Sequence, residues 1–186
     1  MKPFIGIKKL WYCDPLKEVP VPAKLKTLLT SATQVQNVHD GTWGYSMDDP
    51  STTDYKNELN GQVYYRDVTD KGAKTITFTL GVYSWKAKAD LQGGEMVDAT
   101  GAVVTDESKA VGWHSSDTLE NINKCIIAQT KTGNYIVFTN ASIVGKVDTQ
   151  EKNLGLGISA VAMESETDGV EGEYLWDGDA VDKATG

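Results

Sequence analysis

The stretch from Lys74 to Gly94 changes its periodicity halfway along, and this change constrains the fold more than any other feature of the chain. In the first half, apolar residues alternate with threonines. This period of two predicts a strand with one face on a core and the other facing water or a second surface. The alternating apolar residues are Ile76, Phe78, Leu80 and Val82. Ser84 then offers a helix N-cap and Gly93 a stop, which predicts a short helix over about residues 84–92.

This predicted helix has apolar residues on two sides. A helix of about eight residues is unstable alone and must pack against other structure. At about 100° per residue, Trp85 and Ala89 fall together, and Ala87 and Leu91 fall together on nearly the opposite side. One side can pack on the chain's own sheet, and the other then needs a second partner. Two hypotheses remain open: the helix lies in a groove of its own domain, or it lies between its own sheet and a neighbouring subunit.

Short runs rich in β-branched and aromatic residues recur along the rest of the chain, separated by turn signals. They predict a mainly β protein, an antiparallel sandwich or barrel of about eight to ten strands flanked by the one short helix. We expect a single domain over residues 1–186. Three of its segments have separate predicted roles: residues 14–35 as a covering arm with one or two helical turns at best, residues 48–61 as a long polar loop, and residues 166–186 as an acidic flexible tail.

The negative charge of the chain is concentrated near its C-terminus. Residues 164–186 hold eight acidic residues and one lysine, so they carry −7 of the total formal charge of −8. An acidic surface disfavours binding to phosphate backbones. We therefore expect no specific nucleic-acid binding, although nucleic acid can still lie close to such a surface without adhering to it.

Features that indicate the compartment of the chain all suggest the cell interior. No N-terminal segment has the signal-peptide pattern of a basic start, a long apolar run and a small-residue cleavage site. No run approaches the roughly 18 apolar residues of a membrane span. Cys13 and Cys125 lie far apart in the sequence, each in strand-like surroundings. We interpret them as buried reduced thiols, with a disulfide between them as the alternative. These features predict a soluble intracellular product.

Motifs that would carry catalysis are missing from the sequence. It has no GxGxxG, P-loop, HExxH or CxxC pattern. His39 and His114 each sit beside strand signals, and we interpret both as structural. The segment from Asp177 to Asp182 has only part of a calcium-loop pattern, without the later acidic ligands. We therefore predict no enzyme activity and no catalytic, cofactor-binding or metal-binding residues.

Three segments together resemble the major tail tube proteins of phages. They are residues 48–58, residues 75–83 with the short helix and glycines that follow, and residues 141–152. The resemblance covers about residues 36–165 and rests on composition rather than on catalytic motifs. It implies a β-sandwich or barrel flanked by one helix, closing into hexameric rings that stack into a DNA-conducting tube in a phage or prophage tail. The tubes of type VI secretion and other contractile injection machines share that fold.

The resemblance also implies partners and a location. The main partner would be the chain itself, followed by other tail proteins such as the tape measure and the tail terminator, with the sheath as a further candidate. DNA would pass through the bore without specific binding, kept sliding by acidic groups, and no membrane would be involved. The protein would lie in the virion tail, and in the host cytoplasm during assembly.

Two segments then become candidates for self-assembly contacts. The loop over residues 48–61 would reach across a ring or to the next ring, and the two-sided helix would pack against a neighbour. The candidate interface residues are Asp48, Asp49, Pro50, Tyr55, Lys56, Glu58, Trp85, Ala89 and Leu91. The alternative function is a carbohydrate- or ligand-binding β-sandwich module, in which surface tryptophans and tyrosines would form the binding platform.

Overall fold

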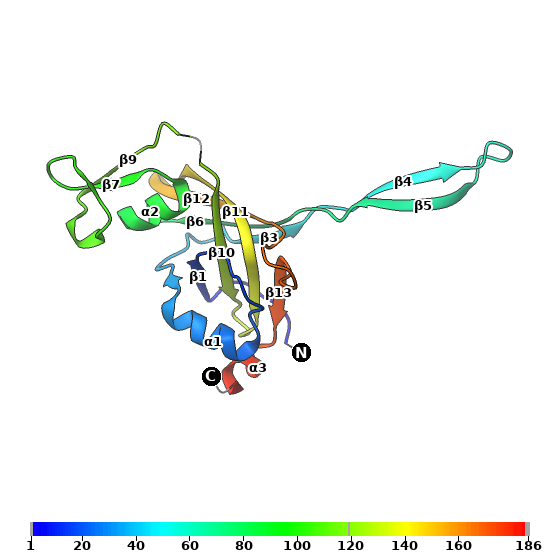
Figure 1. Ribbon diagram of the computed structural model, residues 1–186, viewed down its shortest axis with the longest axis horizontal. Coiled ribbons are helices and arrows are strands. Elements are labelled where there is room, and N and C mark those ends of the chain that lie inside the picture. Colours follow the sequence, from blue (N-terminus) through cyan, green and yellow to red (C-terminus); the bar gives the residue numbers. More distant parts are fainter. Residues whose placement is uncertain (1, 119, 185–186) are drawn as a thin grey trace.

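The computed structural model describes residues 2–118 and 120–184, and its centre is one antiparallel sheet of eight strands (Figure 1). The strand order is β2 (Thr33–Gln34), β1 (Lys9–Cys13), β10 (Ile122–Gln129), β11 (Tyr135–Gln150), β12 (Asn153–Ala162), β6 (Lys74–Leu80) and β3 (Gly44–Met47). The eighth strand, β13 (Glu173–Trp176), pairs with β11. This arrangement is the mainly β, sandwich-like fold that the sequence predicts.

Strand β11 holds the two halves of the sheet together. It is 16 residues long. Its first half pairs with β10 on one edge and with β13 on the other, and its second half pairs with β12. The sheet curls over itself, since the ring of Tyr45 in β3 lies 6.2 Å from that of Phe138 in β11, centroid to centroid.

The main core lies inside this curl. The alternating residues Ile76, Phe78 and Leu80 of β6 are buried there against β10, β11 and β12, which confirms the predicted period of two. Val82 is exposed because the strand ends at Leu80. Gly145 of β11 packs closely on α2 (Trp85–Gln92), the helix that follows β6. A Cβ added at Gly145 would lie 2.4 Å from the Leu91 carbonyl oxygen.

A second, smaller core covers the outer face of β1, β10 and the first half of β11. Leu25 of α1 (Pro22–Ser31) and Val181 of α3 (Gly178–Lys183) are buried there against Trp11, Ile127 and other sheet residues. The predicted arm therefore does cover the sheet. It does so as a ten-residue helix, longer than the one or two turns that its scattered leucines predict.

The C-terminal segment through residue 184 lies against the body of the molecule, unlike the flexible acidic tail that the sequence predicts over residues 166–186. In its described part, β13 pairs with β11 and α3 packs on α1. Lysines from the N-terminal part of the chain contact this segment. The Lys2 ammonium lies 2.6 Å from the Asp179 carboxylate. Lys26 Nζ donates to the carbonyl oxygens of Asp182 and Ala184, 2.9 Å away in each case.

Two extensions leave the body at opposite ends (Figure 1). One is a hairpin of β4 (Ser51–Lys56) and β5 (Val63–Asp70). The other holds α2 (Trp85–Gln92), the short strands β7 (Glu95–Val97), β8 (Val103–Val104) and β9 (Gly112–His114), and the 3₁₀ turn η1 (Glu107–Lys109). The described chain thus has three α-helices rather than one, and every one of them is too short or too polar to cross a bilayer.

Candidate self-assembly surface

The hairpin of β4 and β5 stands clear of the body (Figure 1), and every residue of its two strands is exposed except the half-buried Asp67. At about 3.3 Å per residue, the eight residues of β5 span roughly 26 Å. The two strands form a sheet of their own, so each keeps one unpaired edge among the described residues. Such edges offer N–H and C=O groups to a strand from another molecule.

The structure shows that the long polar loop predicted over residues 48–61 is largely one strand of a hairpin. Six of those residues form β4, and only the tip between the strands is a turn. Cross-strand contacts hold the hairpin together: the rings of Tyr55 and Tyr65 lie 5.7 Å apart, centroid to centroid. The Arg66 guanidinium donates to both carboxylate oxygens of Asp54, at 2.5 and 2.9 Å, and lowers the pKa of that carboxyl.

These contacts stabilise the hairpin only modestly. An isolated two-stranded hairpin is marginally stable in water, and exposed ion pairs add little stability. The hairpin nevertheless presents large apolar side chains to solvent. Leu59 at the tip is 94% exposed, Tyr64 is 70% exposed and Val68 is 60% exposed. Clustered exposed apolar residues mark interaction sites. The hairpin is thus the clearest candidate surface for a partner.

The neck of the hairpin, where the chain leaves β3 and returns to β6, depends on a close backbone approach. The Asp48 N–H donates to the Ala73 carbonyl oxygen at 2.9 Å. Gly72 lies beside this bond with a φ of +77°, and an added Cβ would lie 2.0 Å from the Asp48 carbonyl oxygen. A side chain at this position would therefore force the two legs of the hairpin apart.

We expect Gly72→Ala to open this neck, while Gly61→Ala at the hairpin tip should leave it closed. Both glycines have a similar positive φ, +77° and +72°, but Gly61 has open space around its Cβ position. Both variants therefore carry the left-handed backbone cost of about 1–2 kcal/mol, and only Gly72→Ala adds the backbone clash. Hydrogen exchange of the Asp48 amide should be at least about tenfold faster in Gly72→Ala than in Gly61→Ala. Equal rates in the two variants would contradict this account of the neck.

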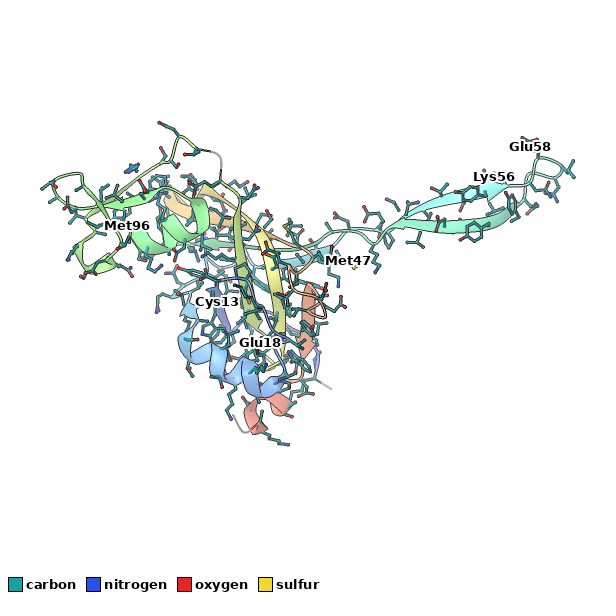
Figure 2. The ribbon with its side chains drawn as sticks, in the orientation of Figure 1. Cys13, Glu18, Met47, Lys56, Glu58 and Met96 are labelled. Atoms are coloured by element: carbon teal, nitrogen blue, oxygen red, sulfur yellow. The ribbon has the colours of Figure 1, made fainter. Side chains whose placement is uncertain are left out.

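Six of the predicted interface residues lie on or beside the hairpin. Asp48, Asp49 and Pro50 form its outgoing neck, and Tyr55 lies on β4. Figure 2 places Lys56 on the outer part of the hairpin and Glu58 at its tip. The prediction missed the exposed apolar residue at the tip, Leu59, and the returning strand, which carries most of the others. Those missed on this strand are Val63, Tyr64, Tyr65 and Val68.

Helix α2 lies at the other end of the body and has the caps that the sequence predicts. The Ala87 N–H donates to Ser84 Oγ at 3.1 Å, and the chain leaves the helix through Gly93. One side of the helix packs on its own chain, where Leu91 is fully buried in the main core. Leu91 is therefore removed from the interface candidates.

A second side of α2 is covered by the small three-stranded sheet. The Lys88 ammonium lies 4.3 Å from the centroid of the Trp113 ring in β9 and 5.4 Å from that of Tyr83. Lys88 Nζ also donates to Gln92 Oε1 at 2.9 Å, and burial lowers the pKa of this lysine. The side that stays open bears Trp85, which is 41% exposed, with Ala89 half-buried beside it.

The predicted interface residues thus fall into two groups at opposite ends of the molecule, one on the hairpin and one on α2 (Figure 1). They do not converge on one site within a single chain. Two separate patches of this kind can meet only between copies, when the patch of one molecule contacts a different patch of the next. Such a head-to-tail contact produces rings or filaments.

Groups that could support chemistry are dispersed. Within the residues that the structure describes, no cluster of three metal-ligating side chains occurs. His114 lies at the surface, with Nε2 3.4 Å from the Glu95 carboxylate. A cavity of about 430 Å³ opens between α2 and the edge of the sheet, and Tyr12 at its wall donates its hydroxyl to Asp90 at 3.1 Å. Burial beside this carboxylate raises the pKa of Tyr12.

Two comparisons with known proteins found no relative of this chain. Neither the protein-family models nor the curated proteins that were searched match the chain.

Proposed function

We propose that this protein is a structural subunit of a phage or prophage tail tube. Copies of the chain associate into hexameric rings, and the rings stack into a hollow tube that conducts DNA. The observation that carries this proposal is the projecting hairpin of β4 and β5, whose Tyr64, Val68 and Leu59 side chains are exposed in the single chain. The hairpin can bury them only on another molecule.

The shape of the hairpin favours a protein partner over a small ligand. Its exposed aromatic residues lie along an extended two-stranded ribbon rather than around a concavity, and small-molecule sites are concave. The unpaired strand edges suit pairing with another β element. A second copy of the chain provides such β-strands. Every copy carries both a hairpin and these strands, so the two are always present at equal concentration.

The open side of α2 supports a second contact in the same assembly. Trp85 is exposed on this side. Helix α2 itself lies at the end of the body away from the hairpin (Figure 1). In a ring, every subunit offers one end to the preceding neighbour and the other end to the following neighbour. Two different patches at opposite ends of the body meet this requirement, whereas one patch repeated on both partners would give a closed dimer.

The charge of the chain is consistent with DNA that passes without binding. The formal net charge is −8, and part of the acid is neutralised within the chain by Lys2 and Lys74. The remaining acidic groups disfavour adhesion to a phosphate backbone. Tape-measure and terminator proteins would then be the further partners, in the virion tail and in the host cytoplasm during assembly.

Electron microscopy of the purified protein, alone and with a tail-assembly partner, tests this function. We expect rings or stacked tubes about 100 Å across, a size estimated from single-domain dimensions. Sedimentation at increasing concentration should show the same association in solution. A protein that stays monomeric under all these conditions would count against the proposal. If its tryptophan fluorescence were also quenched by one member of a glycan panel, the carbohydrate-binding alternative would take its place.

A further inference from the structure

The two cysteines of the chain, which are distant in sequence, are direct cross-strand neighbours. Cys13 is the last residue of β1, and its partner in the antiparallel register with β10 is Cys125. Residues that face each other in such a ladder have Cα atoms about 4.5–5.5 Å apart. This spacing lies within the roughly 4.4–6.8 Å that a disulfide requires. Both thiols also belong to the outer core beneath α1, so they project from the same face of the sheet.

The two thiols are free and lie in unlike environments. Cys125 is fully buried, whereas Cys13 is half-buried at the end of its strand. Hydrogen bonding by the Cys125 thiol lowers the pKa of Cys13 and outweighs the opposing effects of burial and of Asp14. The same interaction, together with burial, raises the pKa of Cys125. One thiol is therefore the more acidic and the more accessible, and the other is sheltered behind it.

We propose that Cys13 and Cys125 form a reversible oxidation site, in which Cys13 reacts with a peroxide and Cys125 resolves the product into a disulfide. A half-buried thiol whose pKa is lowered and that directly neighbours a second cysteine has the arrangement of a redox-sensitive pair. The register and burial of the two residues carry this proposal, and the lowered pKa of Cys13 supports the order of reaction. The proposal does not depend on the proposed tube function, and either can fail without the other.

The chemistry balances with hydrogen peroxide as the oxidant. The Cys13 thiolate attacks one peroxide oxygen, an S–O bond forms, the O–O bond breaks, and the leaving hydroxide takes a proton to become water. The Cys125 sulfur then attacks the Cys13 sulfur, so that an S–S bond forms and the S–O bond breaks. The departing hydroxide takes up the Cys125 proton as a second water. The two thiols lose two electrons and the peroxide gains them.

The cross-link would join β1 to β10 without rearranging either strand, because the two are already paired. It closes the chain between residues 13 and 125, and closing a long loop restricts the unfolded state strongly. For a chain of this size we expect the melting temperature to rise by about 10 °C on oxidation and to fall back on reduction.

The experiment treats the folded wild-type protein with hydrogen peroxide and maps its peptides by mass spectrometry. We expect an intramolecular link between the peptides of Cys13 and Cys125, a mass loss of two hydrogen atoms, and complete reversal by a dithiol reductant. The proposal would be overturned if both thiols stayed free after peroxide treatment of the folded protein, or if they formed disulfides only between molecules.

The single variants test the separate roles of the two residues. In Cys125→Ser, peroxide should leave Cys13 as a sulfenic acid that a cyclic diketone probe labels. In Cys13→Ser, the buried Cys125 should stay unlabelled while the protein is folded. Equal labelling of the two variants would overturn the assigned order of reaction. Because Cys125 lies in a core, each variant is first compared with wild type by circular dichroism, and the peptide map of the wild-type protein tests the link itself without any substitution.

Discussion

A chain in which the dipeptide Asn-Gly replaces residues 49–72 should fold like the wild type and lose self-assembly. The excised segment contributes no residue to either core. Its flanking residues are already paired, since the Asp48 N–H donates to the Ala73 carbonyl oxygen at 2.9 Å. A two-residue Asn-Gly turn is the connection that such a pair accepts. If the hairpin provides the main contact between copies, association should weaken by more than about 100-fold.

Sedimentation and electron microscopy measure the loss of assembly, and thermal unfolding followed by circular dichroism checks the fold. A matched variant keeps the hairpin at full length but carries Leu59→Ser, Tyr64→Ser and Val68→Ser, and it should also fail to assemble if apolar contact drives association. A conservative variant on the same hairpin, Thr52→Ser, should assemble normally. An Asn-Gly chain that still forms tubes would exclude the hairpin as the main contact.

Substituting aspartate on the two sides of α2 should have opposite consequences. Leu91 is fully buried in the main core, so Leu91→Asp leaves a cavity and buries a carboxyl group. Each of these effects is costly, and together they should remove more than about 4 kcal/mol of the free energy of unfolding. Trp85→Asp lies on the open side of the helix, 41% exposed, so it should lower that free energy by only about 1 kcal/mol and weaken assembly instead.

Thermal unfolding and sedimentation of the two variants, measured in parallel, separate these effects. Leu91→Ala serves as the control for Leu91→Asp, because it removes the same side chain without adding a charge and should cost about 2–5 kcal/mol. If Trp85→Asp also unfolds the chain, α2 lies in a groove of its own domain. If Trp85→Asp assembles like wild type, the open side of the helix is not a subunit contact.

Local signals in the sequence were enough to predict the unit of β6 and α2. Ile76, Phe78 and Leu80 alternate because one face of their strand meets the core. Ser84 caps the helix with its hydroxyl oxygen, and Gly93 ends it with a positive φ. These features depend on neighbours a few residues away. The side of the helix that stays open was not predictable, because it depends on Trp113, which reaches Lys88 from a distant strand.

The hairpin escaped prediction for a different reason. A strand exposed on both faces has no apolar face, so a run such as Ser51–Lys56 shows no period of two. Its polar residues are also those typical of loops, which made residues 48–61 resemble an irregular connection. The consecutive Val63, Tyr64 and Tyr65 did indicate a strand, but the sequence could not show that this strand stays outside the core.

The remaining differences come from long-range contacts. The C-terminal segment is acidic and rich in glycine, and it packs because β13 pairs with β11 and Val181 is buried in the outer core, with Lys2 and Lys26 adding surface contacts from the other end of the chain. Strand β11 is continuous although Asn140 and Ser142 interrupt its apolar pattern. The side-chain amide of the buried Asn140 donates to the Glu164 carbonyl oxygen at 2.8 Å, while its Oδ1 has no partner among the described residues.

The sharing of β11 between both halves of the sheet gives the molecule two kinds of mechanical behaviour. Because β11 pairs with strands of both halves, a force on either half acts on the same strand, and we expect the body to respond as one block. The hairpin joins that block at its neck, where Asp48 pairs with Ala73, so we expect any bending of the hairpin to occur beside this pair and to leave the packing of the body unchanged. A stack of such subunits would bend by small rotations at its hinges while each block kept its shape.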